Sequence, residues 1–125
     1  MNPEKMDTKR ILVVEDDQLM RSFLTQILIE DEYQVESARD GQEAKEKIKE
    51  SDFDLVLTDL KMPRLSGLEL MQQVRAEKPE IRWIIITAYG SISNAVEAIK
   101  AGASDYLTKP LREPEELRHV VRRVF

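Results

Sequence analysis

Acidic, hydroxyl and cationic side chains stand directly after the apolar stretches of this sequence, where strands would end. Four stretches have this arrangement: 11–14 is followed by Glu15-Asp16-Asp17, 53–58 by Asp59, 81–86 by Thr87, and 105–108 by Lys109. The carboxyl ends of parallel strands lie along one edge of a sheet, and open α/β sheets bind their ligands there. The sequence therefore predicts one polar site built from residues that are far apart in the chain.

The predicted site suits phosphoryl chemistry. Carboxylates packed together raise one another's pKa values, and a bound divalent cation removes that cost. Mg²⁺ prefers oxygen ligands and is usually held by few carboxylates together with a phosphate. A phosphoryl group on Asp59 would carry negative charge that Mg²⁺, Lys109 and the Thr87 hydroxyl can offset. We therefore expect Asp59 to be a nucleophile that forms an acyl phosphate.

Apolar runs alternate with amphipathic stretches along the chain, which indicates five β-α units. The expected strands are 11–14, 33–37, 53–59, 81–87 and 105–108. The expected helices are one capped by Asp17, one opened by Asp40-Gly41, one from Leu68 that ends before Pro79, one over 91–101 stopped by Gly102, and one from Glu113. This alternation predicts a single α/β domain with a parallel sheet, right-handed crossovers and helices on both faces.

Side-chain spacing predicts which helix faces are buried. In helix 91–101 one side carries Ile92, Ala95, Val96 and Ile99, and in the last helix the inward residues are Leu117, Val120, Val121 and Val124. The basic residues of the last helix fit a solvated face or a helix end: Arg118, Arg122 and Arg123. We expect His119 to be exposed and Trp83 to serve in packing.

Length and composition exclude several classes of protein. The chain has 125 residues, enough for one domain with a real core. No apolar stretch approaches the roughly 18–20 residues that span a bilayer, so we expect no membrane segment. Cysteine is absent, which excludes disulfides and thiolate sites and is compatible with a cytoplasmic location. The net charge of −5 argues against direct binding of nucleic acid.

Four strings in the sequence resemble the receiver domain of two-component response regulators. They are Ile11-Leu12-Val13-Val14-Glu15-Asp16-Asp17, Thr58-Asp59-Leu60-Lys61-Met62-Pro63, Ile86-Thr87-Ala88-Tyr89 and Tyr106-Leu107-Thr108-Lys109-Pro110-Leu111. The resemblance implies a flavodoxin-like, doubly wound domain with strand order 2-1-3-4-5 and five helices. We assign residues 9–125 to this receiver domain and 1–8 to an N-terminal tail.

The resemblance also implies roles for individual residues. Asp59 looks like the phosphoacceptor, and Glu15 and Asp16 look like the acidic pair that supports Mg²⁺. Lys61 resembles the position whose backbone carbonyl binds that Mg²⁺. Lys109 resembles the lysine that contacts the phosphate.

Further positions resemble those that set the rate of dephosphorylation and those that change conformation on phosphorylation. Thr87 and Tyr106 look like a switch pair, in which the hydroxyl moves toward the phosphate and the ring rotates inward. A plainer interpretation of Tyr106 is an ordinary half-buried strand tyrosine. The side chains of Lys61 and Tyr89 occupy places that tune dephosphorylation in the family, and Pro110 resembles a cis proline.

The resemblance implies partners as well. A sensor histidine kinase would donate the phosphate, and the helix of 91–101, the strand 105–108 and the last helix would form a homodimer surface or contact an output domain. The segment 90–103 is most similar to receivers of sigma-54-activating regulators. We therefore expect a C-terminal output domain that this chain does not contain, with control of transcription as its role. Such a domain assists its own phosphorylation and is not an enzyme in the ordinary sense.

Three other functions remain as alternatives. A degenerate receiver would act only as a dimerisation module. An aspartyl-phosphate phosphatase of the haloacid dehalogenase type would carry a second Asp two residues after the nucleophile, where this chain has Lys61. A flavodoxin-like nucleotide carrier would need a phosphate cradle after the first strand, where Glu15-Asp16-Asp17 would repel a phosphate.

Overall fold

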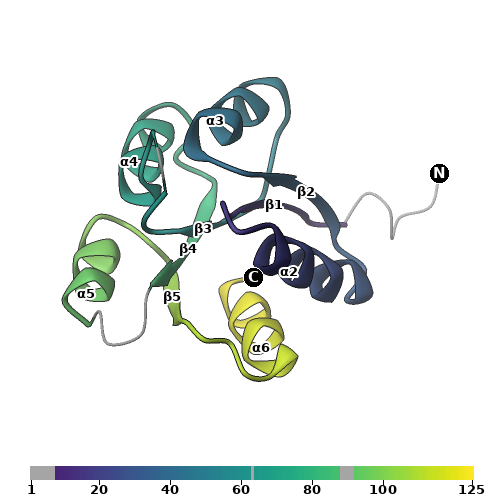
Figure 1. Cartoon of the computed structure of the whole chain (residues 1–125). Coiled ribbons are helices and arrows are strands. Elements are labelled where there is room, and N and C mark those ends of the chain that lie inside the picture. The colour runs from purple at the N-terminus through teal and green to yellow at the C-terminus, as the bar shows by residue number, and fades with distance from the viewer. Residues whose placement is uncertain (1–7, 63, 88–91) are drawn as a thin grey trace.

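A five-stranded parallel sheet forms the centre of the molecule in the computed structural model, which describes residues 8–62, 64–87 and 92–125 (Figure 1). The strand order is β2-β1-β3-β4-β5, as predicted. The strands are β1 (Arg10–Val14), β2 (Gln34–Ala38), β3 (Leu55–Asp59), β4 (Arg82–Thr87) and β5 (Asp105–Thr108). The doubly wound α/β fold is therefore confirmed.

Helices cover both faces of this sheet. In the described part of the chain they are α2 (Gln18–Glu30), α3 (Gly41–Glu50), α4 (Gly67–Glu77), α5 (Ile92–Lys100) and α6 (Pro114–Val124). One core cluster joins α3, α4 and α5 to one face of the sheet, and a second cluster joins α2 and α6 to the other. None of these helices has the combined length and hydropathy that crossing a bilayer requires.

The central strands are buried on both faces, and this explains their continuous apolar composition. All five residues of β3 are buried, and along β1 alternate residues enter the two clusters: Leu12 and Val14 in one, Ile11 and Val13 in the other. Burying each such side chain contributes about 1.5–3 kcal/mol. The sheet therefore provides a rigid platform for the residues at its carboxyl edge.

Polar side chains cap three helices where each begins. The Asp17 carboxylate accepts a hydrogen bond from the Met20 N–H at 2.9 Å, and Asp40 accepts one from the Glu43 N–H at 2.8 Å. Ser66 and Glu69 form a reciprocal capping box at the start of α4. The Asp17 cap was predicted, whereas the capping box was missed although Ser66 stands three residues before Glu69.

Two helix predictions need correction. Helix α4 begins at Gly67, one residue before the predicted Leu68, because the capping box sets its start. In α5 the sheet-facing residues are Ala95 and Ala98, while Val96 and Ile99 are 47% and 41% exposed. The small alanines allow α5 to pack closely, so its larger apolar side chains lie outward.

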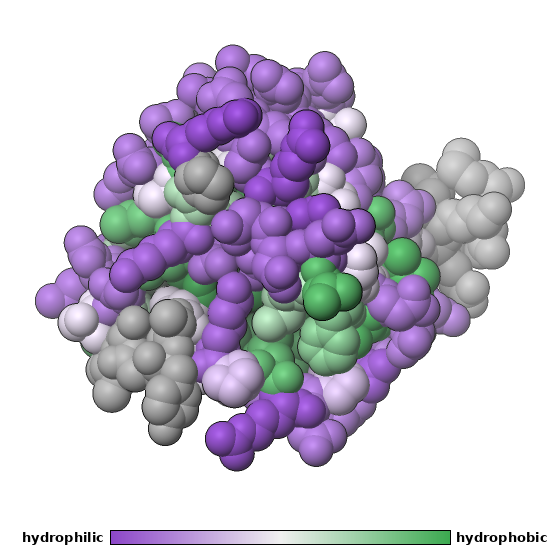
Figure 2. Space-filling model, in the orientation of Figure 1, coloured by the Kyte–Doolittle hydropathy of each residue, from purple (hydrophilic) through white to green (hydrophobic). Residues whose placement is uncertain are grey.

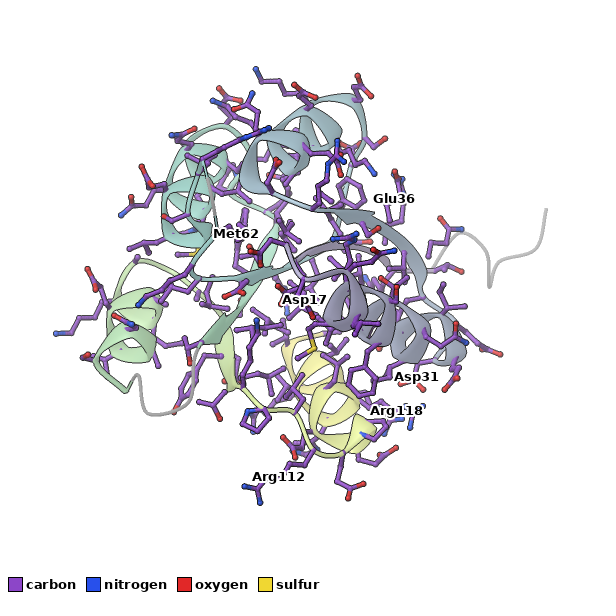
Figure 3. The ribbon with its side chains drawn as sticks, in the orientation of Figure 1. Asp17, Asp31, Glu36, Met62, Arg112 and Arg118 are labelled. Carbon is purple, nitrogen blue, oxygen red and sulfur yellow. The ribbon has the colours of Figure 1, made fainter. Side chains whose placement is uncertain are left out.

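Arg122 and Arg123 lie in the last turn of α6, as the helix-end interpretation expected. The basic residues of α6 also form ion pairs, which the solvated-face interpretation did not anticipate. Arg118 lies beside Asp31 at the end of α2, with 3.3 Å between Nε and Oδ1 (Figure 3). Arg118 also pairs with Glu30 of α2 at 2.9 Å, and Arg123 pairs with Asp105 of β5. These pairs connect α6 to its neighbours in the fold. His119 is exposed and Trp83 is fully buried, as predicted.

Gly67 allows the start of α4 to approach the end of β3. A Cβ atom at this position would lie 2.2 Å from the carbonyl oxygen of Asp59 and 3.2 Å from the Cα of Leu60. Both atoms belong to the backbone, so no side chain can rotate away to make room. The glycine is required for the approach of these two segments.

We expect Gly67→Ala to lower the free energy of unfolding by roughly 2 kcal/mol or more, because β3 and α4 must separate. Urea unfolding followed by circular dichroism measures the change. The control is Gln72→Ala, an exposed position of the same helix, which should change stability by about 0.5 kcal/mol or less. Equal stabilities of Gly67→Ala and the control would contradict this account.

Candidate functional site

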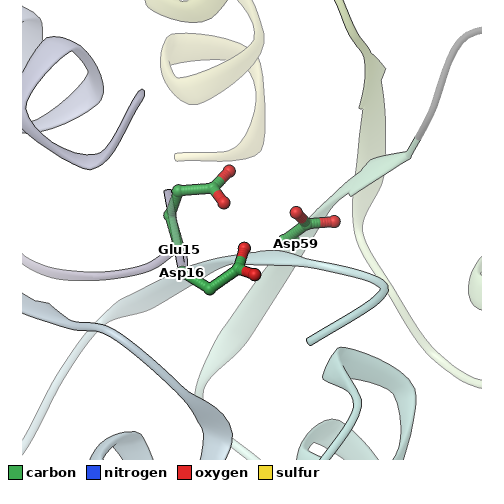
Figure 4. A group of neighbouring side chains, drawn as sticks. All are labelled: Glu15, Asp16 and Asp59. Atoms are coloured by element: carbon green, nitrogen blue, oxygen red, sulfur yellow. The ribbon is translucent and has the colours of Figure 1, made fainter. Parts of the chain in front are cut away.

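Three carboxylates from two strand ends lie together at the carboxyl edge of the sheet (Figure 4). Glu15 and Asp16 follow β1, and Asp59 is the last residue of β3. One oxygen of each group lies within 4.8 Å of the others. Glu15 is fully buried and Asp59 nearly so, whereas Asp16 is exposed. The cluster therefore has two buried acids and one that faces solvent.

Lys109 links the two buried acids. Its Nζ lies 2.8 Å from Asp59 Oδ2 and 2.8 Å from Glu15 Oε1. The lysine comes directly after β5, and its backbone N–H donates to the carbonyl of Thr87 at 2.8 Å. The peptide bond between Lys109 and Pro110 is cis, as the resemblance implied. This loop thus brings a cation across the sheet edge to the carboxylates.

The backbone around the cluster holds each acid in place. The Lys61 N–H donates to Asp59 Oδ1 at 3.2 Å, and the Asp17 N–H donates to Glu15 Oε2 at 3.1 Å. The Arg21 side chain donates to the backbone carbonyl of Glu15 at 2.8 Å. Asp59 therefore has Lys61 on one oxygen and Lys109 on the other.

Arg21 was missed by the sequence analysis. It lies in the first turn of α2, where the helix dipole disfavours a cation. A basic residue at such a position signals a specific contact, and here that contact supports the Glu15 backbone.

Burial and neighbouring charges together raise the pKa values of both Glu15 and Lys109. Burial raises the pKa of Glu15 to about 7, with Asp16 and Asp59 adding to the rise while Lys109 and the Asp17 N–H oppose it. Burial alone would lower the pKa of Lys109, but its contacts with Asp59 and Glu15 outweigh this and raise that pKa overall. One lysine therefore does not fully compensate the buried negative charge.

The residues of the cluster fit a hard divalent cation. Glu15 Oε1 is buried and lacks a hydrogen-bond donor at a suitable angle, although Lys109 lies at ion-pair distance. Glu15, Asp16 and Asp59 offer oxygen ligands on one side of the site, which is the chemistry that Mg²⁺ prefers. A cation there would lower the repulsion that raises the Glu15 pKa.

Thr87 and Tyr106 occupy different surroundings. Thr87 ends β4 and is fully buried, and its hydroxyl donates a long hydrogen bond of 3.4 Å to the Leu107 carbonyl. The Tyr106 side chain is 41% exposed on β5, so the structure does not bring it into the acidic cluster. Tyr89 lies outside the described residues.

Comparison with known proteins gives consistent matches. The family model for the response regulator receiver domain matches residues 11–122. The chain is 43% identical over 111 residues to the transcriptional regulatory protein ZraR of Klebsiella oxytoca, covering 89% of this chain and 24% of that protein. It is 41% identical over 117 residues to the response regulator MprA of Mycolicibacterium vanbaalenii, covering 91% of this chain and 51% of that protein. The chain thus spans between a quarter and a half of these relatives.

Solved structures show the same fold. A CheY-like receiver domain protein from Methanospirillum hungatei superposes with a TM-score of 0.86 at 35% identity, covering 94% of this chain and 93% of that one. NtrX from Brucella abortus superposes with a TM-score of 0.89 at 31% identity, covering 94% of this chain and 26% of that one.

The Glu15 pKa predicts how the stability of the metal-free protein depends on pH. Its pKa is about 7 when folded against an ordinary value of 4.5, so the folded state binds the extra proton. The stability that this proton contributes is present below pH 4.5 and is lost as the pH rises from 4.5 through 7. Glu15→Gln lacks this titration. Between pH 5 and 8 its free energy of unfolding should therefore rise relative to that of the wild type by on the order of 2 kcal/mol.

Urea unfolding in EDTA at several pH values measures this difference. Loss of one partner of Lys109 changes the free energy of unfolding by a constant amount, so the comparison uses only the change of that free energy with pH. Added Mg²⁺ should stabilise the wild type more than Glu15→Gln, because the variant loses a carboxylate ligand. Parallel pH profiles for the two proteins would show that Glu15 does not titrate in this range.

Proposed function

This chain belongs to the response regulator receiver domain family, and on that basis we propose that Asp59 accepts a phosphoryl group from a sensor histidine kinase in the presence of Mg²⁺. The observation that carries the proposal is the joint placement of Asp59, the acidic pair and Lys109. A nucleophilic carboxylate, metal ligands and a cation for the phosphoryl oxygens meet at one point.

The proposed step transfers the phosphoryl group between two nucleophiles. An oxygen of Asp59 attacks the phosphorus, the P–N bond of the phosphohistidine breaks, and its electron pair returns to the imidazole nitrogen. Mg²⁺, when held by Glu15, Asp16, Asp59 and the Lys61 carbonyl, would neutralise charge on the phosphoryl oxygens. Lys109 is 2.8 Å from Asp59 and offsets the same charge from the other side.

The kinase would approach Asp59 over α2. Hydrophobic side chains gather over this helix on the face shown in Figure 2. Leu19 is 81% exposed and Phe23 is 37% exposed, and both lie within two turns of Asp17 beside the acidic cluster. Exposed apolar residues next to a polar site are typical of a protein interface.

Thr87 would couple phosphorylation of Asp59 to a conformational change in the rest of the domain. When a phosphoryl group is present, the Thr87 hydroxyl would leave its 3.4 Å contact with Leu107 and donate to a phosphoryl oxygen, and Tyr106 would turn inward behind it. The surface formed by α5, β5 and α6 exposes Val96, Ile99 and Tyr106. We assign homodimer contacts or binding of an output domain to this surface.

The relatives support a proposal about the larger protein. ZraR is named a transcriptional regulatory protein, and the chain covers 24% of it. We assign residues 9–125 to a cytoplasmic receiver domain, 1–8 to a tail, and control of transcription to an output domain outside this chain. The haloacid dehalogenase type of phosphatase is disfavoured because Lys61 occupies the place of its second Asp.

We expect incubation with acetyl phosphate and Mg²⁺ to add one phosphoryl group, measured by intact mass spectrometry. Asp59→Asn should abolish the added mass, because the amide is not a nucleophile of this kind. Asp17→Asn is the matched control, since Asp17 caps α2 and should leave the reaction intact. Absence of phosphorylation with both Mg²⁺ and Mn²⁺ would favour a degenerate receiver.

We expect Thr87→Ala to be phosphorylated and yet to lose most of the phosphorylation-dependent shift in oligomeric state, because the moving hydroxyl is gone. Size-exclusion chromatography with light scattering, before and after phosphorylation, measures the shift. Thr87→Ser should retain it, and Thr108→Ala, an exposed threonine that ends the adjacent strand, is the control. A full shift in Thr87→Ala would argue against a switching role.

A further inference from the structure

A cavity of about 330 Å³ lies between α3 and α4, which pack side by side on one face of the sheet (Figure 1). Helix α3 contributes Lys45, Ile48 and Lys49 to its lining, and α4 contributes Val74 and Glu77. None of the described residues that line this α3–α4 cavity belongs to the acidic cluster. Another cavity does share a residue with that cluster, and it is lined by Asp16, Arg39, Asp40 and Arg64.

The α3–α4 cavity lies along the later turns of the two helices. Both helices begin at the carboxyl edge of the sheet, where Gly67 lies against the backbone of Asp59 and Gly41 against that of Leu65. Val74 is about 10 Å further along α4 than Gly67, at roughly 1.5 Å per residue. The cavity is therefore separate from the site around Asp59, and the function proposed above does not involve it.

The floor of the cavity is apolar. Ile48 and Val74 are 2% and 5% exposed, and both belong to the core cluster that joins these helices to the sheet. Lys45 and Lys49 lie one turn apart on α3 beside this floor, and lysine side chains cover apolar surface with their methylene groups while the ammonium reaches solvent. A ligand in the cavity would thus meet apolar surface below and positive charge at the edge.

Two of the lysines that line the cavity have ammonium groups available to a ligand. Lys78, which follows α4, is already engaged, because its Nζ donates to the Ile48 carbonyl at 2.6 Å and lies 3.4 Å from Asp52 Oδ1. Within the described part of the chain, no hydrogen bond or ion pair engages the ammonium groups of Lys45 and Lys49. Two lysines one turn apart repel each other, so an anion between them would relieve that repulsion.

The balance of charge around the cavity favours a ligand with one negative charge. Glu77 is the one acid among the described residues of the lining, whereas Glu46 and Glu50 of α3 are exposed outside it. With Lys78 paired to Asp52, two lysines against one glutamate leave a single positive charge in excess. A carboxylate matches this excess better than a phosphate, which carries a charge of about −1.5 to −2.

We propose that the α3–α4 cavity binds a small apolar carboxylic acid in its ionised form, with the apolar body between the helices and the carboxylate between Lys45 and Lys49. The cavity volume is near the lower end of the range for small-molecule sites, about 300–1,000 Å³. At about 30 Å³ for each water-sized group, the cavity holds on the order of ten non-hydrogen atoms. Phenylacetate and octanoate are acids of that size.

Hydrogen bonding from α4 completes the match. Gln73 also lines the cavity, and its amide N–H groups can donate to the same carboxylate that the lysines attract. Because an ammonium is a compact charge without a fixed fork, the lysines select for charge, and the apolar floor selects for the body of the ligand. Both parts of the ligand are therefore needed for binding.

The test titrates the whole chain with phenylacetate and, separately, with octanoate, and follows the methyl resonances of Ile48 and Val74 by ¹H–¹³C NMR. Both acids should shift these resonances to saturation with a Kd on the order of 1 mM or below. Phenylacetamide keeps the shape of phenylacetate without its charge, and acetate keeps the charge without the ring. Each should bind about fivefold more weakly or worse.

Lysine variants locate the carboxylate. Lys45→Gln and Lys49→Gln should each weaken phenylacetate binding about threefold, and the double variant about tenfold, while phenylacetamide binding stays the same. Lys49→Arg should retain the affinity, because it keeps the charge. The matched control is Lys100→Gln, which removes the same charge from an exposed position of α5 outside the cavity and should change nothing.

Three results would overturn the inference. They are the absence of shifts at Ile48 and Val74 with both acids, equal affinities for phenylacetate and phenylacetamide, and equal effects of Lys45→Gln and Lys100→Gln. These lysines lie outside the acidic cluster, so phosphorylation of Asp59 by acetyl phosphate should proceed in every variant. Failure of the inference therefore leaves the proposed function standing, and failure of phosphorylation leaves the test of this cavity unaffected.

Discussion

Lys109 lies between two buried carboxylates that the sheet brings together from neighbouring strands. Its Nζ is 2.8 Å from Glu15, which follows β1, and 2.8 Å from Asp59, which ends β3. Removing one partner from a buried charge pair costs roughly 3–5 kcal/mol, so the edge of the sheet depends on this lysine. Because the same charge can meet a phosphoryl group on Asp59, one interaction stabilises the fold and supports the proposed chemistry.

Lys109 offsets only part of the negative charge that is buried at this edge of the sheet. The pKa of Glu15 is raised to about 7 chiefly by burial, even though Lys109 opposes the rise. Selection for stability alone would favour replacing Glu15, because ionising a buried carboxyl group costs free energy. A cation bound beside Glu15 and Asp16 would offset the repulsion, so the strained acid is what makes the site ready for a ligand.

The surroundings of the site are rigid on one side and exposed on the other. Gly67 and Gly41 let two loops approach the backbone of Asp59 and Leu65, and these contacts leave no room for a side chain. On the opposite side, α5 rests on the sheet through Ala95 and Ala98 and exposes Val96 and Ile99. Fixed loops would suit the proposed phosphoryl site, and the exposed apolar side chains of α5 would suit the surface that we propose responds to it.

The sequence by its own pattern predicted the α/β class and the meeting of Glu15, Asp16, Asp59 and Lys109, because the carboxyl ends of parallel strands lie along one edge of a sheet. The order of the strands was implied by the resemblance to receiver domains, and the structure confirms it. The family match to residues 11–122 agrees with that prediction. Tertiary structure decided the rest. Four features depend on contacts between segments that are far apart in the chain: the outward side chains of α5, the ion pairs of Arg118, the hydrogen bond from Arg21 to the Glu15 carbonyl, and the cavity lined by Arg39 and Arg64. The spacing of residues along the sequence carries no information about such contacts.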